Sequence, residues 1–169
     1  MEHLRHLAPT YPEVGATQGD LPPGYRTLRV VRVLGTGPQA FQRAADQLLG
    51  WQLHRRAGVR VRATDEPAVL GTVCQLGVGL GGLRLWAPCR VVLVVDEPHR
   101  RGFAYGTLPG HPVSGEELFT VELDDRDRVV LRIVTFSRPG TRWSAFALPL
   151  TEQVQEILTA RYLHALVDG

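Results

Sequence analysis

The spacing of apolar residues predicts one strand and then one helix near the start of the chain. From Thr27 to Leu34 apolar and β-branched residues dominate, which predicts a strand. Pro38 follows a glycine-rich break and suits the first turn of a helix, where its missing N–H costs nothing. Apolar side chains then recur at three- and four-residue steps, at Phe41, Ala44, Ala45, Leu48 and Trp51. This spacing predicts a helix over residues 38–56 with one buried face, ended by Gly58.

Short extended segments make up the middle of the chain. Each is bounded by clusters of Gly, Pro or Asp, as strands in an antiparallel sheet are. They cover residues 59–64, 68–78, 83–96, 101–108, 117–124 and 128–137. The acidic turn over residues 124–128 predicts a hairpin between the last two of them.

A second helix is expected at the C-terminal end. Thr151 can cap it, because a threonine hydroxyl accepts from free amides of the first turn. Its predicted apolar face consists of Val154, Ile157, Leu158, Tyr162 and Ala165. The element order predicts an α+β fold: a mostly antiparallel curved sheet of about seven strands, one helix after the first strand and a C-terminal helix. This order is helix-grip-like, and a cavity can open between such a sheet and its last helix.

Length and composition favour one domain. The chain has 169 residues, of which 44% are hydrophobic and 21% charged, enough to bury a sizeable core. We expect a single domain over residues 1–169. Residues 1–25 are rich in Pro, Gly and Thr, and we expect them to form an N-terminal arm packed on the domain.

Composition also excludes several kinds of chemistry. All 19 basic side chains are arginine, so Schiff-base enzymes and lysine-dependent phosphate loops are excluded. Arginine without lysine is typical of a GC-rich bacterial genome. The formal net charge of +2 is too small to indicate a nucleic-acid partner. The charged start and the lack of any run near ~18 apolar residues predict a cytoplasmic protein with no membrane insertion.

Cysteine usage gives no sign of a metal or redox site. Cys74 and Cys89 lie in predicted strands, without a CxxC spacing or a Cys/His cluster. We expect two buried free thiols, no metal and no cofactor.

The densest polar stretch runs from Phe103 to Glu117 and reads as one loop between two strands. It holds a phenol, an imidazole and two carboxylates, from Tyr105, His111, Glu116 and Glu117. A histidine beside a carboxylate is the usual general acid/base pair, which makes these four the candidate catalytic residues. The structural alternative is that His111 hydrogen-bonds a turn while the two glutamates bind backbone amides or face water.

Several separated motifs resemble one family. They are Tyr105–Pro112, Gly115–Glu117, Tyr11–Thr17, Trp51–Gly58 and Phe136–Pro139, which together span nearly the whole chain. In this order they resemble DUF1990, an uncharacterised family of bacteria and plants. The resemblance implies no established enzymatic activity.

If these motifs meet in one place, they supply a candidate ligand-binding set beside the four catalytic candidates. Its members are Tyr11, Glu13, Thr17, Trp51, His54, Ser137 and Arg138. Convergence of polar groups from distant segments suits a binding site, and it equally suits a buried network that holds the arm. Arg138 could clamp an anion, or pair internally with Glu13, Glu116 or Glu117.

Three functions therefore stand side by side. The first is binding of an unidentified small, partly apolar molecule between the sheet and the C-terminal helix. The second is an acid/base enzyme that uses His111 with Glu116 or Glu117. The third is a structural or interaction module, in which the polar motifs only lock the arm onto the sheet.

Overall fold

A seven-stranded antiparallel sheet forms the body of the molecule, as the sequence predicts. In the computed structural model, residues 1–80, 83–140 and 148–166 are described. The strand order is β1-β7-β6-β5-β4-β3-β2. The strands are β1 (Arg26–Thr36), β2 (Arg60–Ala63), β3 (Val73–Leu80), β4 (Leu83–Glu97), β5 (Arg100–Thr107), β6 (Val113–Leu123) and β7 (Arg128–Pro139). The predicted hairpin over residues 124–128 is present between β6 and β7, and Asp127 takes the positive φ of 62° that the turn requires.

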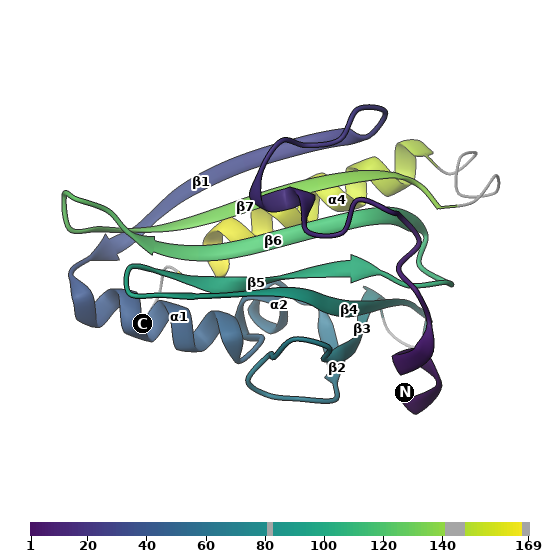
Figure 1. Cartoon of the computed structure of the whole chain (residues 1–169), viewed down its shortest axis with the longest axis horizontal. Helices are drawn as coiled ribbons and strands as arrows, with labels where there is room; N and C mark the ends of the chain where they lie inside the picture. The colour runs from purple at the N-terminus through teal and green to yellow at the C-terminus, as the bar shows by residue number, and fades with distance from the viewer. Residues whose placement is uncertain (81–82, 141–147, 167–169) are drawn as a thin grey trace.

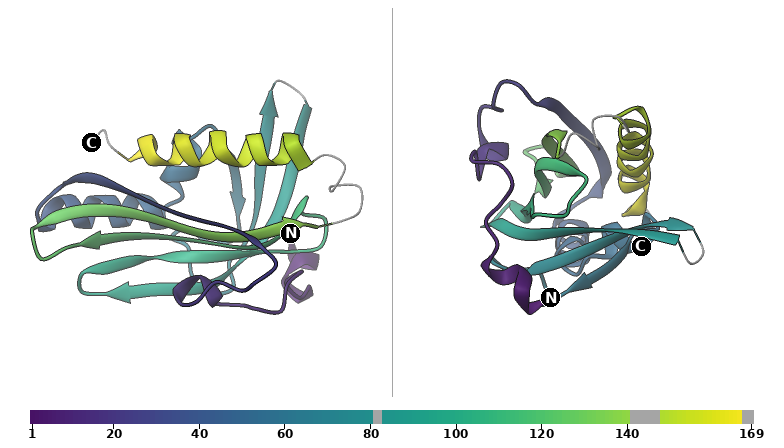
Figure 2. Two further views of the ribbon diagram at one scale, coloured as in Figure 1. Left: turned by 90° about the horizontal axis from the view of Figure 1, so that it is seen from above. Right: turned by 90° about the vertical axis from the view of Figure 1, so that its right-hand side faces the viewer.

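Helices and arm lie on opposite faces of this curved sheet (Figures 1 and 2). Helices α1 (Pro38–Leu49), α2 (Gln52–Arg56) and α4 (Leu148–Ala165) cover the concave face. The N-terminal arm crosses the convex face and contains two 3-10 helices, η1 (Glu2–His6) and η2 (Ala16–Gln18). No helix in the described ranges is both long and apolar enough to cross a membrane.

The prediction of one helix over residues 38–56 is wrong at its centre. Helix α1 stops at Leu49, and Trp51 adopts a left-handed conformation with φ 60° before α2 begins. The break turns the chain so that Trp51 can be fully buried, with its indole N–H donating to the carbonyl of Asp65. Burial of a large aromatic ring outweighs the cost of about 1–2 kcal/mol for a left-handed non-glycine residue.

The polar segment from Phe103 to Glu117 is not one loop, which corrects a second prediction. Residues 103–107 belong to β5 and residues 113–117 to β6, so that only residues 108–112 connect the strands. The segment 68–72 precedes β3 and is not extended strand. Since successive residues of a strand point to opposite faces, Glu116 and Glu117 must lie on different sides of the sheet.

The C-terminal helix is present, but its start and part of its buried face differ from the prediction. Helix α4 begins at Leu148, so Thr151 lies inside it and is not its cap. Tyr162 and Ala165 are buried, as predicted, whereas Ile157 is 52% exposed. The side chain of Val154 lies outside the described residues.

Two apolar layers follow from the alternation of side chains. The larger core fills the concave face and joins the helices to Phe103, Phe119, Leu131 and Ile133. A smaller cluster of Val95, Ala104, Leu118 and Val134 lies on the convex face, where Leu21 of the arm packs against it. Cys74 and Cys89 are buried free thiols at paired positions of β3 and β4.

Candidate functional site

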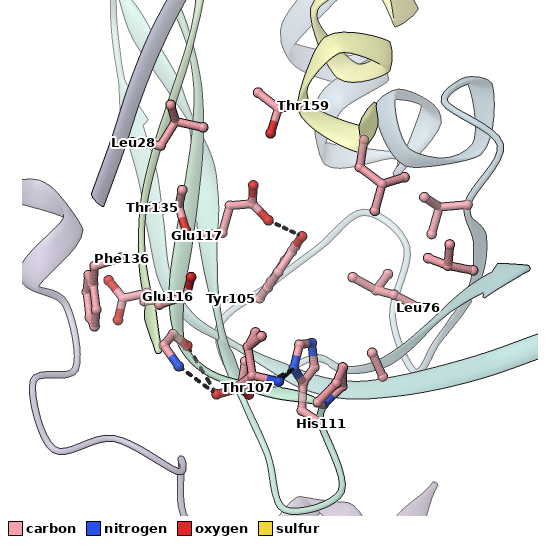
Figure 3. A pocket seen from close by; sticks show the side chains of 18 of the residues that line it. Leu28, Leu76, Tyr105, Thr107, His111, Glu116, Glu117, Thr135, Phe136 and Thr159 are labelled. Atoms are coloured by element: carbon pink, nitrogen blue, oxygen red, sulfur yellow. Dashed lines mark hydrogen bonds between the residues drawn. The ribbon is translucent and has the colours of Figure 1, made fainter. Parts of the chain in front are cut away.

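A cavity of about 620 Å³ lies between the concave face and α4 (Figure 3). Its walls come from β1, β3 to β7 and α4, and most of the lining surface is apolar. Leu28, Leu76 and Val78 supply aliphatic surface from the two flanks of the sheet, and Thr159 and Tyr162 reach it from α4. A cavity can open here because the curved sheet holds the helix away from its central strands.

A half-buried carboxyl and a phenol form the polar end of this cavity. The hydroxyl of Tyr105 donates to Oε2 of Glu117 at 2.7 Å, between paired positions of β5 and β6. Burial raises the pKa of Glu117 to about 7, although the Tyr105 hydrogen bond acts in the opposite direction. Burial, together with the nearby Glu117 carboxylate, also raises the pKa values of Tyr105 and Tyr162. Glu117 can therefore gain or lose a proton near neutral pH, while both phenols stay protonated.

His111 sits at the edge of the cavity in the connection between β5 and β6. Its Nδ1 lies 2.9 Å from the carbonyl oxygen and 3.1 Å from the amide nitrogen of Val113, and the tautomer decides whether it donates to the first or accepts from the second. Burial lowers the pKa of His111 to about 4, so the ring is neutral at pH 7. In the described part of the chain, no hydrogen bond joins this ring to Glu116 or Glu117, and its partner is the turn itself.

Glu116 points to the convex face, where it anchors the N-terminal arm. Its carboxylate accepts hydrogen bonds from the Tyr11 hydroxyl and the Gly15 amide, both at 2.7 Å. It also accepts from the amide and the hydroxyl of Thr17. Gly106, its strand partner, has no Cβ, and the Tyr11 ring occupies the space that a Cβ would take. These contacts make a buried network between the arm and the sheet.

Glu13 and Arg138 lie around this network, whereas Ser137 does not. The Tyr25 hydroxyl donates to Glu13 at 2.8 Å, and the guanidinium of Arg138 lies 4.6 Å from the centre of the Tyr25 ring. Arg138 is exposed, and its contact in the described region is this ring rather than Glu116 or Glu117. Ser137 is buried on β7 and contributes to the cavity wall.

Trp51 and His54 belong to the core next to the cavity. Both are fully buried, and the His54 ring is surrounded by the rings of Trp51, Phe119 and Tyr162 at 5.0–5.3 Å between centroids. Burial lowers the pKa of His54 to about 3. Tyr105, which lines the cavity, is 5.7 Å from the same imidazole.

The predicted site residues thus separate into three groups. Tyr105, His111, Glu117 and Ser137 line the cavity, Trp51 and His54 lie in the adjoining core, and the remainder are on the arm side. The arm group comprises Tyr11, Glu13, Thr17, Arg138 and the carboxylate of Glu116.

Sequence reasoning missed several residues of the cavity wall. Leu28 and Thr135 face each other from β1 and β7, and strand alternation could have placed them beside Glu117. Thr159 carries no sequence signal of its own. Within the described residues, no group of three or more His, Cys, Asp or Glu side chains is arranged to hold a metal ion.

The raised pKa of Glu117 predicts a pH-dependent loss of stability. The unfolded chain ionises Glu117 near its ordinary pKa of 4.5, whereas the folded protein does so near 7. The stability contributed by the protonated group is complete below pH 4.5 and is lost as the pH rises through 7, by about 3 kcal/mol. Glu117→Gln should therefore be more stable than the parent at pH 8 and similar near pH 4.5.

Urea denaturation at both pH values measures this difference. Glu122→Gln is a suitable control, because Glu122 lies on the convex side of the same strand, paired with Arg132. If the stability of Glu117→Gln and that of the parent protein depended on pH in the same way, the raised pKa of Glu117 would be contradicted.

Curated relatives match the chain over most of its length. A UPF0548 protein of Deinococcus radiodurans is 36% identical over 174 aligned residues, which cover 96% of this chain and 88% of the relative. A UPF0548 protein of Dictyostelium discoideum is 26% identical over 151 residues, covering 80% and 70%.

Solved structures share the fold at lower identity. The ZhuI aromatase/cyclase from Streptomyces sp. R1128 superimposes with a TM-score of 0.58 at 21% identity, covering 85% of this chain and 92% of the cyclase. A hypothetical protein from Helicobacter pylori gives a TM-score of 0.57 at 12% identity, covering 95% and 94%. These similarities identify the helix-grip fold.

The family comparison agrees with the sequence motifs. A model described as a domain of unknown function, DUF1990, matches residues 10–165. This range includes the arm network, the cavity and α4. The chain therefore belongs to the DUF1990 family.

Proposed function

We propose that the protein binds a small, partly apolar molecule in the cavity between the concave face and α4. The observation that carries this proposal is the cavity of about 620 Å³, with mostly apolar walls and the Tyr105–Glu117 pair at one end. Small-molecule sites typically measure about 300–1,000 Å³ and combine apolar walls with a few polar groups that orient the ligand. The fold shared with an aromatase/cyclase is compatible with such a role.

The proposal divides the polar residues by task. Tyr105 and Glu117 orient the ligand, and Leu28, Leu76 and Val78 contact its apolar part. Tyr11, Thr17 and Glu116 hold the arm on the other side of the sheet and do not touch the ligand. Two of the three hypotheses drawn from the sequence then apply to different faces of the same sheet.

Filling the cavity should weaken ligand binding. Leu28 and Val31 lie on opposite faces of β1: Leu28 lines the cavity, and Val31 is 52% exposed. We expect Leu28→Trp to weaken binding of the neutral fluorophore N-phenyl-1-naphthylamine by about tenfold or more, since the indole occupies ligand space. Val31→Trp should bind the fluorophore as the parent protein does.

Fluorescence titration of both variants and the parent tests this expectation. Thermal unfolding shows whether the two variants are equally folded. Absence of fluorophore binding to the parent, or equal binding by Leu28→Trp and Val31→Trp, would refute the cavity as the site.

A further inference from the structure

One oxygen of the Glu117 carboxyl is open to the cavity. Oε2 is taken by the Tyr105 hydroxyl, while no hydrogen bond to Oε1 is present in the described part of the chain. Among the described residues, the buried side-chain nitrogen and oxygen atoms without a hydrogen-bond partner are the two ring nitrogens of His54. Oε1 of Glu117 is not among them, so this oxygen is accessible from the cavity. Figure 3 shows the carboxyl projecting from β6 into the cavity, with one oxygen toward Tyr105 and the other away from it. A ligand can therefore reach Oε1.

The described groups beside this carboxyl carry no positive charge. Tyr105 reaches it from β5, Tyr162 from α4 and Cys89 from β4, and burial raises the pKa of each of them. All three are neutral at pH 7. They do not balance the charge of the carboxylate.

The basic side chains that the structure describes near the cavity do not neutralise Glu117 either. His111 at the edge and His54 in the core both have lowered pKa values, because burial disfavours their charged forms. Arg26 also lines the cavity, but its side chain is exposed at the mouth and has an interaction of its own. Among the described residues, burial and the Tyr105 hydrogen bond set the pKa of Glu117, and no arginine contributes.

Within the described residues, this half-buried carboxylate has one hydroxyl donor and no cation, and the cavity has room for a ligand that brings one. We propose that the cavity takes an apolar amine, whose ammonium group binds Oε1 of Glu117 while its hydrocarbon part contacts the aliphatic walls. This inference rests on the proposed function and specifies its ligand class. Hydrogen bonds to a charged partner are stronger than neutral ones.

Binding of such an amine is linked to the proton on Glu117. Below pH 7 the carboxyl is increasingly protonated, and it then offers a neutral hydrogen-bonding group instead of a negative charge. The affinity for an ammonium ligand should therefore rise as the pH increases from 6 to 8. The affinity for a neutral ligand of the same shape should change little.

Three adamantane derivatives of equal shape test the preference. 1-Adamantanamine, 1-adamantanol and 1-adamantanecarboxylic acid compete with N-phenyl-1-naphthylamine for the full-length protein at pH 6, 7 and 8. We expect the amine to bind about tenfold more tightly than the alcohol at pH 8, since a charge-assisted hydrogen bond replaces a neutral one. The acid should bind most weakly, because it repels Glu117.

Three variants distinguish the role of the Glu117 carboxylate from that of the rest of the cavity. Glu117→Gln should lose the preference for the amine over the alcohol. Glu122→Gln, on the other face of the same strand, should keep it. Tyr105→Phe removes the hydrogen bond that lowers the pKa of Glu117, and should move the pH dependence of amine binding upward.

The outcomes distinguish this inference from the function on which it rests. If neither the fluorophore nor any adamantane compound binds the parent protein, the proposed function itself fails. If the fluorophore and the alcohol bind but the amine has no advantage, or keeps its advantage in Glu117→Gln, the amine inference fails while cavity binding stands. Preference for the acid would likewise overturn it.

Discussion

Glu116→Ala is expected to lower the free energy of unfolding by roughly 3–5 kcal/mol. The substitution removes an acceptor that is 2% exposed and leaves donors from Tyr11, Gly15 and Thr17 without a partner between the arm and the sheet. A buried donor that loses its acceptor carries its full desolvation cost, so several losses at one point have a large effect. Because those donors all belong to the arm, the arm should separate from the convex face.

Chemical denaturation measures the loss, and limited proteolysis within residues 1–25 reports whether the arm is released. Glu13→Ala is the matched control, because its carboxylate accepts one hydrogen bond, from Tyr25, at a partly buried position. That variant should lose about 1 kcal/mol. Similar losses for the two variants, or an arm that stays protease-resistant in Glu116→Ala, would contradict the anchoring role of Glu116.

Alternation of apolar residues was enough to predict the sheet, but not the face of the sheet on which each functional side chain lies. The strands were predicted because Val, Ile and Phe follow one another between Gly, Pro and Asp turns. The start of β6 was placed at residue 117 instead of Val113, because Ser114, Gly115 and Glu116 look like loop residues. Their strand conformation depends on pairing with β7 and on the arm, and neither is encoded locally.

The start of β6 at Val113 instead of residue 117 decides how Glu116 and Glu117 are arranged in the site. With Glu116 and Glu117 in a loop, they appeared as a pair of carboxylates that His111 could use. In a strand they face opposite sides, and each meets a different tyrosine hydroxyl: Glu116 meets Tyr11, and Glu117 meets Tyr105. The family motif around these residues therefore combines an arm anchor and a cavity group in two consecutive positions.

The early helix illustrates a tertiary effect that spacing cannot predict. Trp51 fits the apolar face of an uninterrupted helix, yet its left-handed conformation ends the regular helix and redirects the chain. The redirected α2 places His54 among aromatic rings beside the cavity. His54 was predicted to belong to a ligand-binding set, and that role stays a prediction.

His54 should make the protein sensitive to acid. Its ring is fully buried, and in the described part of the chain neither nitrogen has a hydrogen-bond partner. The unfolded chain protonates this histidine near its ordinary pKa of 6.5, whereas the folded protein resists protonation until about pH 3. Its contribution is therefore complete above pH 6.5 and declines as the pH falls below that value, by about 2 kcal/mol at pH 5.

Replacing His54 by leucine, which has a similar volume, should remove this penalty. At neutral pH we expect a gain of roughly 1–2 kcal/mol, since two buried polar atoms without partners disappear from an aromatic environment. At pH 4 the advantage over the parent should grow by about 3 kcal/mol, because the unfolded leucine variant no longer binds that proton. His111 keeps its own lowered pKa in both proteins, so part of the acid sensitivity remains.

Urea denaturation of the parent and His54→Leu between pH 4 and pH 8 separates the gain in stability at neutral pH from the additional gain in acid. His99→Leu is the control, because His99 is exposed and its ring is solvated before and after unfolding. A His54→Leu variant that is less stable than the parent at every pH would show that the imidazole has a partner which stabilises it. If the stability advantage of His54→Leu over the parent did not grow in acid, His54 would be protonated in the folded state. The aromatic rings around His54 oppose that protonation, because they offer a cation no counter-ion.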